Sequence, residues 1–251
     1  MKHEKPQKGN PYQLTICQHT FPAASIARFS GIDGRVEVYL VEQKKMVRLK
    51  PDDQLFCAKR GWDQRAESGF MKEIEDKYQS LAEVVALDNK RNLNAEEQQI
   101  VTDMFAIWNI REHRKANSIS DQKIECIIDV TRHYTKDEQE ILEKNHIGTI
   151  RPDLSMAGRH LAGLNIQQNL FKVREQMSNA QWGVLKALEG QFVVPDNFSN
   201  VRILPLTPTL CFFSQGQDNE IDKDEVVKVN KLAVESSRIF YFAKDLKECG
   251  Q

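Results

Sequence analysis

Apolar and polar side chains alternate along the first part of the chain. Two stretches carry apolar residues at every second position: Tyr12, Leu14 and Ile16, and then Val36, Val38 and Leu40. A repeat of two residues is typical of half-buried β-strands, so we expect antiparallel strands over residues 11–50. Residues 1–10 are polar and basic and contain Pro6 and Gly9. We expect them to form a flexible tail.

The spacing of apolar residues then changes to that of an α-helix. Two stripes recur every three or four residues: Phe70, Ile74, Tyr78, Leu81 and Val85, and later Ile100, Met104, Trp108 and Arg111. This spacing places each stripe on one face of a helix. Residues 66–178 are therefore predicted to be mainly helical.

Polar residues mark where several of these helices begin. Asn94 with Glu97, and Thr135 with Glu138, have the identities and spacing of capping boxes. Ser155 has a suitable side chain to cap a longer helix. Two shorter helices are expected over residues 121–132 and 136–144.

Strand character returns near the C-terminus. Residues 181–214 contain short apolar runs separated by turn-forming residues, and residues 222–225 are mostly acidic and precede another helical stripe. The pattern predicts strands over 181–214 and a helix over 223–243. The order of strands, helices, strands and helix favours one α+β domain over residues 11–251. We expect an antiparallel sheet built from N-terminal and C-terminal strands, packed with the central helices and the C-terminal helix.

Composition narrows the class of protein. The chain has 35 basic and 36 acidic residues, and hydrophobic residues make up 40% of it. This near balance gives no net field to attract nucleic acid, and no apolar run approaches the roughly 20 residues of a membrane-spanning helix. The five cysteines are an odd number without a C-x-x-C pair, which favours reduced thiols. We therefore expect a cytoplasmic protein that does not cross a membrane.

Just after the first expected strand lies an unusual segment, Gln18-His19-Thr20-Phe21-Pro22. With the Ile26 and Phe29 that follow, it resembles the opening motif of a widespread bacterial family known only as a domain of unknown function, H-H-x-x-P before an aromatic stretch. Gln18 stands where that family has its first histidine. The segment around Asp196 and Asn197 resembles the family's later strand that ends in S-D-N-P.

Three charged residues extend the resemblance through the middle of the chain. Glu67 and Glu75 fall where the family has two glutamates on its first long helix, and Arg111 falls where it has an arginine near the end of the second. The resemblance implies a location for a site but no reaction. A role in bacterial defence against mobile DNA is one hypothesis for a protein of this kind.

The residue chemistry leaves a catalytic and a structural interpretation open. His19 could serve as a general base, with Asp196 and Asn197 holding a divalent metal or orienting a water molecule. This would make a hydrolase or a nuclease, and the His19 to Pro22 run also resembles the first strand of His-Asn-His nucleases. In the structural interpretation, His19 bonds a backbone carbonyl, and Asp196 with Asn197 forms a turn.

A second kind of site lies at the end of the helix that begins after Asn94. Arg111, Arg114 and Lys115 give this end a positive charge that could meet phosphate or simply favour the negative end of the helix dipole. The sequence therefore leaves three functions open: a metal-dependent hydrolase, a module that binds protein or nucleic acid, and an accessory subunit of an assembly. The near-neutral charge favours a protein partner or a second copy of the chain over nucleic acid. No cofactor other than a divalent metal is indicated.

Overall fold

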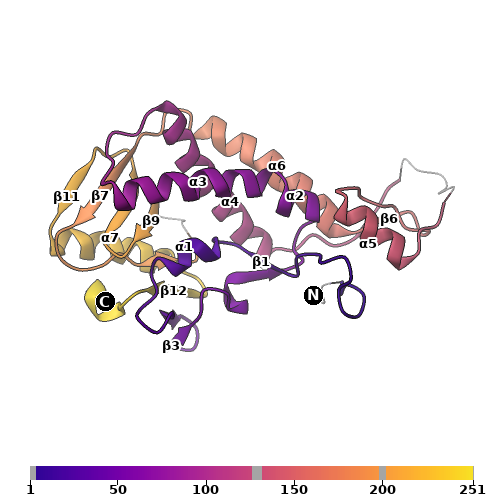
Figure 1. The fold of residues 1–251 in the computed structure, drawn as a ribbon, viewed down its shortest axis with the longest axis horizontal. Coiled ribbons are helices and arrows are strands. Elements are labelled where there is room, and N and C mark those ends of the chain that lie inside the picture. Colours follow the sequence, from indigo (N-terminus) through magenta and orange to yellow (C-terminus); the bar gives the residue numbers. More distant parts are fainter. Residues whose placement is uncertain (1–3, 126–131, 198–201, 251) are drawn as a thin grey trace.

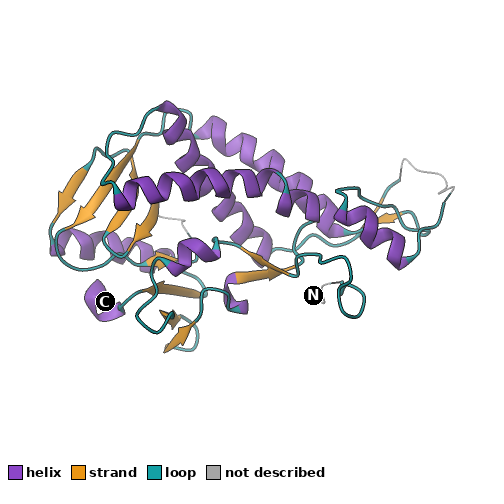
Figure 2. Ribbon diagram, in the orientation of Figure 1, coloured by secondary structure: helices purple, strands orange, loops and turns teal. Residues whose placement is uncertain are grey.

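A computed structural model describes residues 4–125, 132–197 and 202–250 of the chain. Long helices run along the molecule, with two four-stranded sheets towards one end and a small helical and stranded lobe at the other (Figure 1). The helices are α1 (Ala23–Ala27), α2 (Gln64–Ser68), α3 (Phe70–Leu87), α4 (Ala95–Ala116), α5 (Lys136–Lys144), α6 (Gly158–Gln176) and α7 (Lys223–Ser236), with short 3-10 helices η1 (Gln54–Phe56) and η2 (Leu246–Cys249). Figure 2 shows this mixture of helices and strands, which confirms the predicted α+β class.

The strands form two larger sheets and two small ribbons. They are β1 (Cys17–His19), β2 (Val36–Leu40), β3 (Lys45–Leu49), β4 (Cys57–Lys59), β5 (Gln122–Lys123), β6 (Ser155–Met156), β7 (Trp182–Ala187), β8 (Val194–Pro195), β9 (Ile203–Thr207), β10 (Leu210–Ser214), β11 (Asn219–Ile221) and β12 (Phe240–Ala243). One sheet has the order β3-β2-β12-β8 and is antiparallel throughout. It joins N-terminal to C-terminal strands, as the sequence predicted.

The second sheet has the order β11-β7-β10-β9. Its β7, β10 and β9 strands are antiparallel, whereas β11 pairs with β7 in parallel. The ribbons are β1 with β4 and β5 with β6. A single cluster of buried apolar side chains continues from the helices into both sheets. None of the described helices is long and apolar enough to span a bilayer.

The predicted capping boxes are confirmed at two helices. The side chain of Asn94 accepts from Glu97 N at the start of α4, and that of Thr135 accepts from Glu138 N at the start of α5. The Ser155 cap was wrong, because Ser155 lies in β6 and α6 begins after Ala157 without a side-chain cap.

Three predicted boundaries need correction. The strand expected at Tyr12 to Ile16 is absent, because the side chain of Asn10 bonds both backbone groups of Leu14 and that of Gln64 accepts from Thr15 N. These side chains take the place of a neighbouring strand, and β1 begins only at Cys17.

The helix expected over 121–132 is replaced by β5 in its first residues, where the backbone pairs with β6; residues 126–131 lie outside the described part of the chain. The helix expected over 223–243 ends at Ser236. Residues 240–243 form β12 instead, which pairs with β2 on one side and β8 on the other, and all four of its residues are buried.

Residues 4–10, at the end expected to be a flexible tail, make contacts with the body of the chain. Glu4 forms ion pairs with Lys136, Arg151 and Arg159. Gln7 N donates to the carboxylate of the buried Glu140 at 2.9 Å. The N-terminal segment thus contributes charges to the lobe that contains α5.

Candidate functional site: the β1–β4 ribbon and the groove beside it

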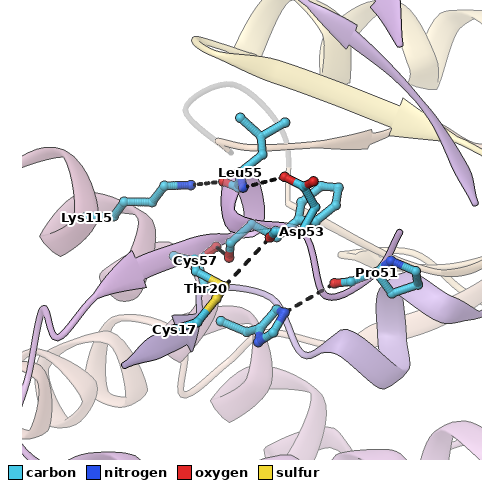
Figure 3. Close-up of a disulfide and its surroundings, with 9 residues drawn as sticks. Cys17, Thr20, Pro51, Asp53, Leu55, Cys57 and Lys115 are labelled. Atoms are coloured by element: carbon cyan, nitrogen blue, oxygen red, sulfur yellow. Dashed lines mark hydrogen bonds between the residues drawn. A yellow bond between two sulfur atoms is a disulfide. The ribbon is translucent and has the colours of Figure 1, made fainter. Parts of the chain in front are cut away.

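The short ribbon of β1 and β4 carries His19. Its register pairs His19 with Cys57 and Cys17 with Lys59. Because successive side chains of a strand alternate between faces, Cys17 and His19 lie on the same face of β1. Cys17 and Cys57 form a disulfide across the ribbon, with their Cα atoms 5.2 Å apart (Figure 3). The expectation of reduced thiols was therefore wrong for this pair, since strand pairing joins two cysteines that are 40 residues apart.

The imidazole of His19 is held by a backbone carbonyl. Its Nε2 lies 3.2 Å from Pro51 O, the contact drawn at Pro51 in Figure 3. A carbonyl only accepts, so Nε2 carries the proton and Nδ1 keeps a free lone pair. Burial lowers the pKa of His19, and the Pro51 carbonyl and the negative charge of Glu75 oppose this effect. In the neutral form of the ring, Nδ1 is therefore the nitrogen that can accept a proton or a ligand bond.

Asp196 and Asn197 form hydrogen bonds with the end of α7 and with the chain that follows it. One oxygen of Asp196 accepts from Arg238 N at 2.8 Å, and the other accepts from Ile239 N at 2.7 Å and Phe240 N at 3.2 Å. Asn197 Nδ2 donates to Ser236 O. Burial raises the pKa of Asp196, and the hydrogen bonds from these three amides lower it in part. The carboxylate thereby fixes the path from α7 into β12.

The segment that contains His19 borders the segment that contains Asp196. Thr20 N donates to Phe56 O, and the Phe56 ring packs edge-on against Phe240 at 5.3 Å between centroids. Phe240 N is one of the amides that donate a hydrogen bond to the Asp196 carboxylate. Among the described residues, however, no hydrogen bond or ion pair joins His19 to Asp196 or Asn197 directly.

Glu112 lies between these two segments, and the sequence pattern did not identify it as a candidate site residue. Its carboxylate accepts from the hydroxyl of Thr20, and burial raises the pKa of Glu112 to about 7, with Lys115 and Thr20 opposing and Asp196 adding to the shift. The signal was present, because Glu112 follows Trp108 by four residues and continues the same stripe of α4. A carboxylic acid with this pKa can exchange protons near neutrality.

Glu67, Glu75 and Arg111 meet in the interior. Arg111 is 1% exposed and donates to Glu75, and its guanidinium carbon lies 5.7 Å from the centre of the Trp62 ring. Trp62 Nε1 in turn donates to Glu67 at 2.5 Å. Burial raises the pKa of Glu67, and the charge of Arg111 and the bond from Trp62 oppose it. The structure brings together three of the residues that the resemblance located.

The resemblance implied that Glu67 and Glu75 lie on one helix, but the structure places Glu67 on α2 and Glu75 on α3. The helix is interrupted at Gly69, which separates α2 from α3. A Cβ atom on residue 69 would lie 2.3 Å from Arg65 O, so only glycine fits this break. The change of direction lets Glu67 and Glu75 both interact with the charge of Arg111.

A groove of about 690 Å³ lies beside the ribbon, where α4 ends. Its charged lining residues are Glu4, Lys59, Arg60, Arg114, Lys115, Asp121 and Arg159. Arg60 and Arg159 both form ion pairs with the buried Glu143, and Arg159 also pairs with Glu4. Lys115 donates to Leu55 O. The remaining cations of the lining, Lys59 and Arg114, form no ion pair with a described residue.

Arg114 brings a buried, unsatisfied donor to this lining. Its Nε is buried and has no hydrogen-bond partner in the described part of the chain, and its Nη1 makes one long contact of 3.4 Å with Asn117 O. A buried donor without a partner costs free energy, which a ligand that supplies an acceptor would recover. Cys57 also lines this groove, so the groove and the ribbon form one continuous site.

Comparisons of the chain with protein-family models, with curated proteins and with solved structures give no match.

Proposed function

We propose that this chain is a binding module that recognises an acidic segment of a protein partner in the groove beside the β1–β4 ribbon. The observation that carries the proposal is the buried Nε of Arg114, which has no hydrogen-bond partner among the described residues, in the same groove as the exposed Lys59. A carboxylate seated there would accept from the guanidinium and offset the charge of the lysine.

The lining favours an acidic peptide over a nucleic-acid backbone. Glu4 and Asp121 interrupt the cations of the groove, so the lining lacks the continuous positive track that a run of phosphates needs, whereas a single carboxylate needs only one or two cations. The groove also presents the apolar side chains of Ala58, Ala116 and Ile119. Mixed charge with small apolar surfaces suits a folded or extended polypeptide. The net charge of -1 agrees with this choice.

The hydrolase alternative gains less support from the geometry. It assigns His19 as the base and Asp196 with Asn197 as metal ligands or water-orienting groups. Asp196 would have to leave three backbone amides in order to take that role. The same carboxylate explains how β12 is connected to α7, and we therefore prefer binding.

The cellular setting is part of the proposal. We infer a bacterial, cytoplasmic accessory protein of the family that the His19 segment resembles, with a defence system against mobile DNA as its context. A second copy of the chain is the other partner that this proposal admits. In a reducing cytoplasm the Cys17–Cys57 pair would be held as thiols.

The ligand class can be tested with labelled probes of equal length: an oligoglutamate peptide, an oligolysine peptide, single-stranded DNA and double-stranded DNA. Fluorescence anisotropy with the full chain at low and at physiological salt should show saturable binding of the acidic peptide and at least about tenfold weaker binding of the others. Tighter binding of either DNA would overturn the choice of a protein partner. Absence of binding to all four probes would overturn the groove as an anion site.

A further inference from the structure

We propose that the reduced chain binds a thiophilic divalent cation, of which Zn²⁺ is the best match, through Cys17, His19 and Cys57. One potential ligand atom from each of these three residues lies within 4.8 Å of the other two. Two thiolates and an imidazole are the ligand types that zinc prefers. This inference does not depend on the ligand of the groove.

The ribbon explains why the three side chains converge. Cys17 and His19 are two residues apart on β1 and share a face, and His19 is directly opposite Cys57 on β4. The cysteines are diagonal neighbours with Cα atoms 5.2 Å apart. Ligands carried by paired strands are held in place before the metal arrives, which reduces the entropy lost on binding.

The surroundings of His19 support metal ligation independently. A histidine that binds a metal through one ring nitrogen commonly donates its other N–H to a carbonyl or carboxylate. Pro51 O already occupies that position at Nε2. The ring is therefore fixed in the tautomer whose Nδ1 can act as the ligand.

The segment that leads to Cys57 is also fixed. Asp53 accepts from Leu55 N at 2.9 Å at the start of η1, and Lys115 on α4 donates to Leu55 O at 2.5 Å (Figure 3). Both bonds are made by the turn just before the ligand. Cys57 borders the groove, which gives a metal ion a path from solvent.

Cys17 and Cys57 can either form the disulfide or bind the metal ion, but not both at once. A dithiol reductant transfers two electrons to the Cys17–Cys57 bond, so the S–S bond breaks, each sulfur gains a proton, and the reductant becomes a disulfide. Binding of Zn²⁺ then releases both thiol protons to solvent and forms two bonds to sulfur and one to nitrogen. Water completes the fourth position, as in other zinc sites with three protein ligands.

Cobalt provides the direct test, because Co²⁺ takes tetrahedral zinc sites and absorbs strongly when thiolates bind it. The full chain would be reduced with a phosphine, freed of metal with a chelator and titrated with Co²⁺, and Zn²⁺ would then be added as a competitor. We expect a thiolate-to-cobalt charge-transfer band that saturates at one ion per chain and disappears with Zn²⁺. The oxidised chain should show no such band.

Single variants identify the ligands. Cys17→Ser, Cys57→Ser and His19→Ala should each weaken Zn²⁺ binding at least about 100-fold, whereas Cys211→Ala, Cys249→Ala and His113→Ala should leave it within about threefold. Circular dichroism would establish that each variant folds. The reduced and oxidised wild-type chains need no substitution, so a misfolded variant does not remove the test. Equal cobalt spectra for these two states, or full affinity in Cys17→Ser, would overturn the site.

Discussion

The guanidinium of Arg111 on α4 donates to the carboxylate of Glu75 on α3, and this pair joins two helices that lie side by side in the interior. Arg111 is almost fully enclosed, with the Trp62 ring and Met71 Sδ as further neighbours. A buried charge tolerates the loss of its partner poorly. The pair therefore fixes the position of the helix that also carries Glu112 and Arg114.

Removing one partner of this pair should destabilise the fold strongly. Arg111→Met leaves the Glu75 carboxylate without its guanidinium, and we expect the free energy of unfolding to fall by about 3 to 5 kcal/mol. Urea denaturation measures this change. The exposed Lys72–Asp76 pair on α3 provides a matched control, where Asp76→Asn should cost less than about 1 kcal/mol. Equal small effects of both substitutions would contradict the structural importance of Arg111.

The raised pKa of Glu112 predicts a specific pH dependence of stability. The folded state holds this proton up to about pH 7, whereas an ordinary glutamate loses it near 4.5. The stability associated with the protonated group is complete below the unfolded pKa and declines as pH rises to the folded value, by about 3 kcal/mol in total. Glu112→Gln should remove this decline between pH 4.5 and 7. Denaturation curves with the same pH dependence in wild type and variant would contradict the assignment.

Substitutions at Asp196 distinguish a structural from a catalytic role. Asp196→Ala leaves three backbone amides without their acceptor, so we expect a loss of about 3 kcal/mol in unfolding free energy. Asn197→Ala removes one hydrogen bond to Ser236 O and should cost about 1 kcal/mol. Thermal or urea unfolding would show the difference. An Asp196→Ala chain as stable as wild type would return Asp196 to consideration as a metal ligand.

Reduction of the Cys17–Cys57 disulfide should lower stability. The bond closes a loop between residues 40 apart, and its loss should reduce the free energy of unfolding by about 2 to 4 kcal/mol. Zn²⁺ added to the reduced chain should restore part of this loss, because it binds the folded ribbon. Unfolding curves for the oxidised, reduced and zinc-loaded chains provide the comparison. A reduced chain as stable as the oxidised one would show that the ribbon needs no cross-link.

Local patterns in the sequence predicted much of the helical framework. The α4 and α5 starts follow capping boxes, which depend on residues three apart. The joining of N-terminal and C-terminal strands followed from the order of elements. The α7 boundary was missed because residues 237–243 continue the apolar spacing of the helix, and only the long-range bonds of Asp196 and the strand pairing show where the helix ends.

The site could be predicted only in part, because its residues are brought together by long-range packing and strand pairing. His19, Glu67, Glu75 and Arg111 were identified as residues of interest, but their grouping depends on the break at Gly69 and on how α3 packs against α4. The pairing of Cys17 with Cys57 depends on the register of two strands 40 residues apart. No local spacing encodes that register, which is why the thiols were expected to be reduced.

The location of the binding site can be tested most directly by reversing the charge of Lys59 and Arg114, two cations of the groove that form no ion pair with a described residue. Lys59→Glu with Arg114→Glu should weaken binding of an acidic peptide at least about tenfold. Lys172→Glu with Lys231→Glu makes the same change of net charge on exposed helix positions outside the groove and should alter binding less than about twofold. Titration calorimetry of the folded variants gives both values. Equal weakening by the two double substitutions would contradict the groove as the site.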